Sequence, residues 1–88
     1  MKVENMINSK GHAVPNQFVI TKVETRQVFF QSYETIIAVQ ENGLTTLDKN
    51  YWDYSRTTLK YLYLFLGMNK KEILAGIGSG DIVLTNLN

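Results

Sequence analysis

An asparagine-glycine pair between two apolar stretches is the feature that most restricts how this chain folds. Asn42-Gly43 tolerates the positive φ angles that a tight hairpin turn requires. It separates residues 33–40, which contain the apolar run Ile36 to Val39, from the shorter stretch at residues 44–47. Two adjacent antiparallel strands are therefore predicted. The uninterrupted apolar run predicts that the first is a central strand covered on both faces.

The residues before this hairpin predict two more strands. Phe18 to Val23 is a β-branched, alternating run, and Val28 to Gln31 follows it after a polar break. Residues 1–16 hold few large apolar side chains and end in a Pro-Asn pair. We therefore expect a flexible N-terminal arm over residues 1–16 and a single domain over residues 17–88.

Helix-capping signals follow the predicted meander. Ser55 is a good N-cap, and Gly67 stands where a left-handed C-terminal cap is expected. Asn69 and Glu72 form a capping-box pattern, and glycines end the second helix. These signals predict helices at residues 56–66 and 70–77 and a strand at residues 82–85. The predicted fold class is α+β: an antiparallel meander of about four strands packed against two helices, with a short C-terminal strand.

Charge and composition exclude several classes of protein. Nine Lys and Arg residues against eight Asp and Glu residues give a net charge of +1, which supplies no strong field for nucleic acid or anionic lipid. No stretch is long and apolar enough for a signal peptide or a membrane span, so no membrane partner is expected. The absence of cysteine fits a reducing compartment and removes thiolate metal sites. We therefore expect a cytoplasmic protein.

The short chain also favours self-association. A domain of 88 residues buries only about 60 to 65% of the surface that its unfolded chain exposes, so its stability margin is small. The segment at residues 56–66 is apolar around nearly its whole circumference, including Tyr61, Leu64 and Phe65. We expect a homodimer, with this helix as its interface.

No catalytic, metal-binding or cofactor-binding group stands out. His12 is the only histidine and lies in the predicted arm, so a transition-metal site or a nucleophile triad is not expected. The glycines of Gly76 to Gly80 follow a predicted helix instead of preceding one, which favours a C-cap over a phosphate loop. The carboxylates available for acid-base chemistry are Asp48, Asp53, Glu72 and Asp81. No spacing singles out a catalytic pair among them, and their positions near turns and helix ends favour capping over catalysis, so we expect a non-enzyme without a cofactor.

The segment at residues 49–56 is the strongest candidate for binding. Tyr, Trp and Arg are the usual anchors of protein interfaces, and this segment carries three aromatic residues before an arginine. The candidate partner-binding residues are Tyr51, Trp52, Tyr54 and Arg56, with Lys60 and Tyr61 in the following helix. Trp52 fits the core as well as it fits an interface, whereas Tyr51 and Tyr54 are expected to be exposed.

Binding of single-stranded nucleic acid is the alternative. Tyr51, Trp52 and Tyr54 would then stack on bases. The cations available for phosphates in this alternative are Lys49, Arg56, Lys60, Lys70 and Lys71.

Several short segments of the sequence together resemble a known family. They are PNQFVI (residues 15–20), FFQSYETIIA (29–38), YWDYSRTT (51–58) and SGDIVLTNLN (79–88). Over roughly residues 11–88 the chain resembles an uncharacterised domain of unknown function from phages and mobile elements of Gram-positive bacteria and from their hosts. The resemblance implies a phage or prophage accessory protein in the bacterial host cytoplasm. By analogy with small phage proteins, its partner is expected to be a host or phage protein, such as a defence nuclease inhibited in the manner of an anti-CRISPR.

Overall fold

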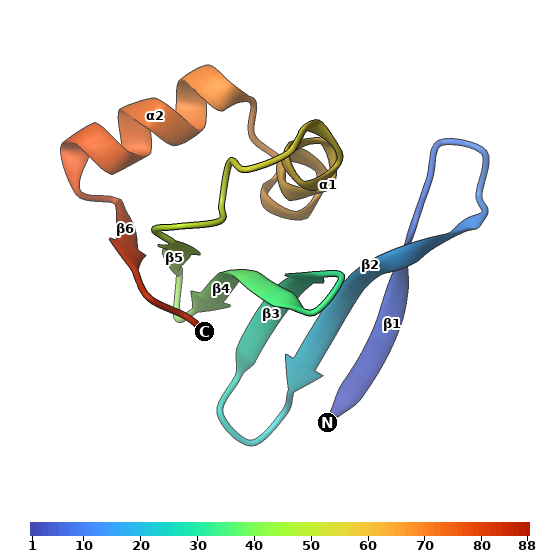
Figure 1. Ribbon diagram of the computed structural model, residues 1–88. Helices are drawn as coiled ribbons and strands as arrows, with labels where there is room; N and C mark the ends of the chain where they lie inside the picture. Colours follow the sequence, from blue (N-terminus) through green and yellow to red (C-terminus); the bar gives the residue numbers. More distant parts are fainter.

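The computed structural model describes residues 1–88 and contains one six-stranded sheet and two helices (Figure 1). In chain order the elements are β1 Lys2–Ile7, β2 Ala13–Lys22, β3 Gln27–Ser32, β4 Thr35–Glu41, β5 Leu44–Asp48, α1 Arg56–Leu66, α2 Lys70–Ser79 and β6 Ile82–Thr85. The strands lie side by side in sequence order. All neighbours are antiparallel except β5 and β6, which are parallel and connected through the two helices. The predicted α+β class is confirmed.

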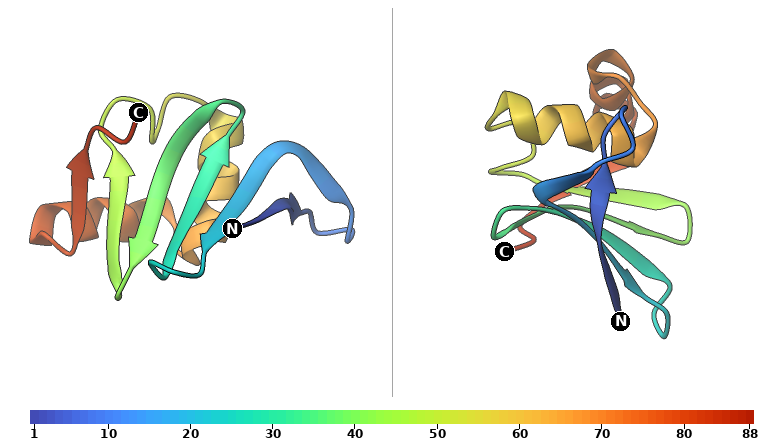
Figure 2. Two further views of the ribbon diagram at one scale, coloured as in Figure 1. Left: turned by 90° about the horizontal axis from the view of Figure 1, so that it is seen from below. Right: turned by 90° about the vertical axis from the view of Figure 1, so that its right-hand side faces the viewer.

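Both helices lie on the same face of the sheet, so the molecule has two layers (Figures 1 and 2). The left view of Figure 2 looks onto the opposite face, with the strands in front and the helices behind them. No helix or loop layer covers this second face, which we call the open face. We call the other one the covered face.

The core lies between the covered face and the helices. Phe30, Ala38 and Leu47 stand directly across from one another on β3, β4 and β5, and all three are fully buried. Leu62 of α1 and Ile73 of α2 are also fully buried and close the core from above. Continuous apolar packing of this kind supplies most of the stability of a small domain.

The helix boundaries follow the predicted caps. The Ser55 side chain accepts a hydrogen bond from the backbone N–H of Thr58, and Gly67 ends α1 with a φ of 66°. Asn69 and Glu72 form the predicted capping box at the start of α2. This helix continues to Ser79, two residues beyond its predicted end, because the glycines inside it keep helical dihedrals and only the last one takes the left-handed position.

The N-terminal residues are not a flexible arm. Lys2–Ile7 forms β1, which pairs antiparallel with β2, and β2 already begins at Ala13. The predicted boundary at residue 16 is therefore wrong. The turn between these strands is held by Asn8, whose Oδ1 accepts hydrogen bonds from the backbone N–H groups of Lys10 and His12. Backbone pairing and this polar turn order the segment without the apolar pattern that usually marks a strand.

The central strand is also not covered on both faces. In β4, Ile37 and Ala38 are fully buried, whereas Ile36 and Val39 are only half-buried and belong to the open face. A bulge between β3 and β4 lets two consecutive residues of β4 reach the core. The chain has only two short helices, and both lie over the other face.

Candidate functional site

The fold buries one aromatic residue of the segment between β5 and α1 and leaves the other two exposed. Trp52 is a core residue with 7% of its surface exposed. Tyr51 and Tyr54 are 44% and 49% exposed, and their rings meet edge to face with centroids 5.7 Å apart. Arg56 is exposed at the first position of α1. Three of the four predicted contact residues in this segment are therefore accessible to a partner.

Asp48 holds this segment in place. Its buried carboxylate accepts hydrogen bonds from the backbone N–H groups of Asn50 (3.1 Å) and Tyr51 (3.0 Å) through Oδ2 and of Leu87 (2.8 Å) through Oδ1. Burial alone raises the pKa of Asp48, but the hydrogen bond from Leu87, the amide of Asn88 and the other two backbone donors outweigh it and hold the pKa below its usual range. The carboxylate thus stays ionised and joins the loop to the C-terminal residues.

The remaining candidates for chemistry are exposed, and two of them are engaged at the ends of α2. His12 and Asp53 are exposed, and the side chain of Glu72 is engaged in the capping box. Asp81 accepts a hydrogen bond from the hydroxyl of Ser79 (3.1 Å) just after α2. No group of three or more His, Cys, Asp or Glu side chains is placed to hold a metal ion. Neither helix is long and apolar enough to cross a membrane.

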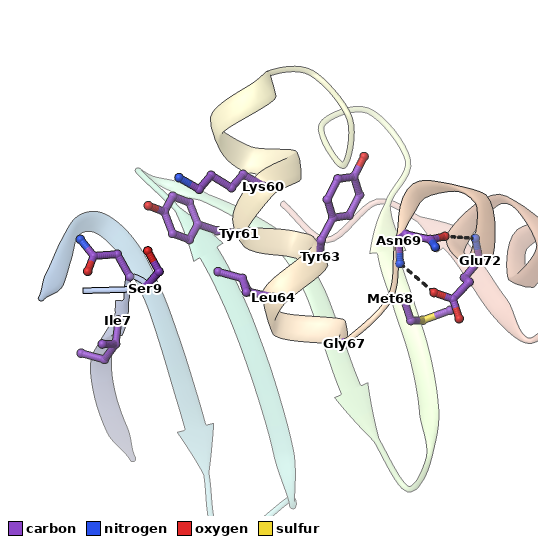
Figure 3. A pocket seen from close by; sticks show the side chains of 11 residues that line it. Ile7, Ser9, Lys60, Tyr61, Tyr63, Leu64, Gly67, Met68, Asn69 and Glu72 are labelled. Carbon is purple, nitrogen blue, oxygen red and sulfur yellow. Dashed lines mark hydrogen bonds between the residues drawn. The ribbon is translucent and has the colours of Figure 1, made fainter. Parts of the chain in front are cut away.

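A groove of about 620 Å³ opens between the β1–β2 turn and the two helices (Figure 3). We call it the helix groove. The residues lining it are Ile7, Asn8, Ser9, Lys60, Tyr61, Tyr63, Leu64, Gly67, Met68, Asn69 and Glu72. Its volume falls within the range of pockets that hold small molecules or partner side chains.

Two exposed apolar side chains belong to this groove. Ile7 at the end of β1 is 55% exposed, and Leu64 on α1 is 56% exposed. Lys60 and Glu72 bring opposite charges to opposite sides of it (Figure 3). Tyr61 beneath Lys60 is 7% exposed and supports the wall, with the Lys60 Nζ 5.4 Å from its ring centroid. The groove therefore combines an apolar lining with a free ammonium group at one side.

The open face carries a second apolar surface. Ile20, Phe29 and Val39 form a row across β2, β3 and β4, and all three are half-buried. A hollow of about 330 Å³ lies on this face, lined by Met1, Ile20, Lys22, Phe29, Ile36 and Leu87. The Lys22 Nζ lies 4.9 Å from the centroid of the Phe29 ring. Antiparallel sheets that are covered on one side usually show polar side chains on the other, so this composition is unusual.

The six predicted contact residues end up in three places. Tyr51, Tyr54 and Arg56 lie on the surface near the start of α1, Trp52 lies in the core, and Lys60 and Tyr61 belong to the helix groove. Sequence reasoning missed the part that Ile7 plays, because it assigned this residue to a flexible arm. It also missed the open face, although apolar residues at successive positions of β3 and β4 beside only two short helices are a signal for it.

A search of curated proteins and a search of solved structures found no match. A family model matches residues 1–81 and thus includes β1 and both helices but ends before β6. This match reaches further toward the N-terminus than the segments that carry the resemblance, which agrees with the ordered β1–β2 hairpin. The chain belongs to this family of unknown function, DUF8033.

Proposed function

We propose that the protein is a non-enzymatic binding module that takes a segment of another protein into the helix groove. The observation that carries this proposal is the presence of Ile7 and Leu64, each more than half exposed, in one groove of about 620 Å³. Apolar side chains gathered in a concave surface lose contact with water when a partner fills it, and such surfaces mark interaction sites.

The charges around the groove define the partner's chemistry. Arg56, Lys60 and Leu64 stand four residues apart on α1, so they share one side of the helix and lead from its start into the groove. The only ion pair in the molecule joins Lys2 and Glu4, which leaves both α1 cations free. The segment that fits best carries an apolar anchor for Leu64 and Ile7 and an acidic residue for Lys60 or Arg56.

We further propose that this partner is a bacterial protein and that the binding inhibits it. The resemblance to phage and prophage domains supports an accessory protein that acts in the host cytoplasm, with a defence nuclease as target in the manner of an anti-CRISPR. A protein that inhibits its partner by binding it in a groove needs no catalytic group. This agrees with the structural role of Asp48 and the capping role of Glu72.

Affinity capture from a bacterial lysate tests the groove. The groove variant is Leu64→Glu, and the matched control is Leu74→Glu, a leucine on α2 that is 49% exposed and does not line the groove. We expect the parent and the control to retain the same protein. The groove variant should weaken its binding by about 30-fold, the loss typical of a removed anchor. Equal capture by both variants would remove the groove as the site.

The exposed residues of the aromatic segment provide a second arm of this experiment. Tyr54→Ala and Arg56→Ala should leave the melting temperature nearly unchanged, because both side chains are exposed. If these variants lose the partner while Leu64→Glu keeps it, the site lies at the start of α1 and not in the groove.

Binding of single-stranded nucleic acid is the second candidate function. Tyr51 and Tyr54 are exposed and lie between Lys49 and Arg56, which is the pattern of a stacking platform with phosphate contacts. Burial of Trp52 removes one of the three expected platforms. A titration with single-stranded DNA and RNA at low salt decides between the candidates, since this function requires binding there that weakens steeply with added salt.

A further inference from the structure

The open face has three rows of side chains that cross the central strands. The middle row is Ile20, Phe29 and Val39 on β2, β3 and β4. The row toward one end of the sheet is Phe18, Gln31 and Ile36. The row at the other end is Lys22, Gln27 and Glu41, in which the Gln27 amide donates a hydrogen bond of 3.0 Å to the Glu41 carboxylate. In each row the central residue belongs to β3.

We propose that a second copy of the chain packs on this face to form a two-fold symmetric dimer, with the symmetry axis between the two sheets and parallel to β3. Rotation about this axis leaves the strand direction unchanged, so the corresponding ends of the two sheets lie together. It also reverses the order of the strands, so β2 of one copy lies opposite β4 of the other. The sheets of the two copies would stack face to face about 10 Å apart, as in a β-sandwich.

The side-chain rows match each other under this symmetry. Ile20 would lie opposite Val39 of the partner subunit, and Phe29 opposite Phe29 of the partner subunit. The apolar residues of the middle row would thus meet only apolar residues. At the end of the sheet, Lys22 would lie opposite Glu41 of the partner subunit, and the symmetry repeats this pair on the other side.

The charge pattern distinguishes a second copy from an unrelated partner. Lys22 and Glu41 carry opposite charges, are half-buried and stand on either side of β3. Neither of them forms an ion pair within the chain. When a second copy is rotated about an axis parallel to β3, each of these charges comes to lie opposite its counterpart of opposite sign. A two-fold interface needs this self-complementarity.

The face is long but narrow. The molecule measures 35 × 31 × 21 Å, and the strands run along its shortest dimension while the two layers stack along the intermediate one (Figures 1 and 2). An ellipse of 35 × 21 Å covers roughly 580 Å², below the roughly 800 Å² that each partner buries in a standard protein interface, so we expect a dimer of moderate affinity.

This interface replaces the helix interface that the sequence predicts. Among the apolar residues of α1, Leu64 alone is more than about a third exposed, since Tyr61 and Leu62 are buried and the others are half-buried. The open face instead carries the continuous apolar row Ile20, Phe29 and Val39. The helices lie on the other side of the sheet (Figures 1 and 2), and their residues line most of the helix groove, so a dimer on the open face would leave both grooves accessible.

Charge reversal with sedimentation equilibrium tests the proposal. The parent should give the mass of a dimer. Lys22→Glu and Glu41→Lys should each place like charges opposite one another twice per dimer and weaken dimerisation at least about tenfold. The double variant carrying both changes should recover the parent's dissociation constant. Lys70→Glu, an equal change of charge at an exposed position on α2, should leave it unchanged.

Two results would overturn this proposal. One is a monomeric parent over the whole micromolar range. The other is a dimer that neither single reversal weakens, as expected if the edge strands β1 of two copies pair instead; Val3→Pro would then dissociate it. Circular dichroism of each variant confirms that a lost dimer reflects the interface and not an unfolded chain.

Discussion

The covered face and the open face of the sheet are built from alternate residues of the same strands, and the two neighbouring phenylalanines of β3 show how they differ. Phe30 is fully buried and stacks on Phe65 of α1, with ring centroids 5.7 Å apart. Phe29 points to the other side, where the Lys22 ammonium lies 4.9 Å from its ring centroid. Similar side chains thus stabilise the fold on one face and remain accessible on the other. Apolar content therefore does not by itself identify the core.

The largest expected effect separates these two phenylalanines. Phe30→Ala should cost about 3 to 5 kcal/mol, because it leaves a cavity in a closed core, and this is comparable to the whole stability of a small domain. Phe29→Ala should cost less, about 1 to 2 kcal/mol, because part of the Phe29 side chain already faces water. Urea unfolding at low protein concentration measures both. Equal costs would mean that the open face is as much part of the monomer's core as the covered one.

A substitution at Asp48 tests the hydrogen bonds that join the loop after β5 to the C-terminal residues. Asp48→Asn should lower the free energy of unfolding by about 3 kcal/mol at neutral pH, because a buried acceptor of several backbone hydrogen bonds loses its charge. The pKa of Asp48 is lower in the folded than in the unfolded chain. Its contribution is therefore fully present above the unfolded pKa of about 4 and is lost as the pH falls through the folded pKa.

The measurement for Asp48 is the unfolding free energy of the parent and of Asp48→Asn from neutral to strongly acidic pH. The difference between the two proteins should shrink only below about pH 4. A difference that stays constant over the whole range would show that the charge of Asp48 does not stabilise the fold.

A smaller effect is expected from two glycines of α2. A Cβ atom at Gly76 would lie 2.7 Å from Cδ1 and 2.9 Å from Cγ1 of the buried Ile82. Gly76→Ala should therefore cost about 1 to 2 kcal/mol, because either the helix or the Ile82 side chain must shift. A Cβ atom at Gly78 meets nothing within 4 Å. Gly78→Ala should stabilise the protein by up to about 1 kcal/mol. Thermal melting distinguishes the two variants, and a stable Gly76→Ala would indicate looser packing there.

The elements that the sequence predicts well are those with local signals. Ser55, Gly67, Asn69 and Glu72 satisfy backbone groups within one turn, so both helix starts follow from short motifs. The β1 strand has no such signal, because its side chains are almost all exposed and its order comes from pairing with β2. Edge strands of this kind are difficult to distinguish from mobile termini in a single sequence.

The candidate sites were less accessible to sequence reasoning. Exposure of Tyr51 and Tyr54 follows from their place in a polar loop, whereas burial of Trp52 depends on the core that it closes. Ile7 and Leu64 both line the helix groove although they are far apart in the chain, and no local pattern encodes that arrangement. The open face is hidden for another reason: alternation assigns residues to two faces but does not say which face the helices cover.

The central claim is that the open face is apolar because a second copy covers it, and the concentration dependence of the melting temperature tests this most directly. Dimerisation stabilises the folded state by mass action, so the parent's melting temperature should rise by several degrees from low to high micromolar protein. In Lys22→Glu this rise should be largely lost, while the melting temperature at low concentration stays close to that of the parent. A parent melting temperature that is the same at every concentration would contradict the claim.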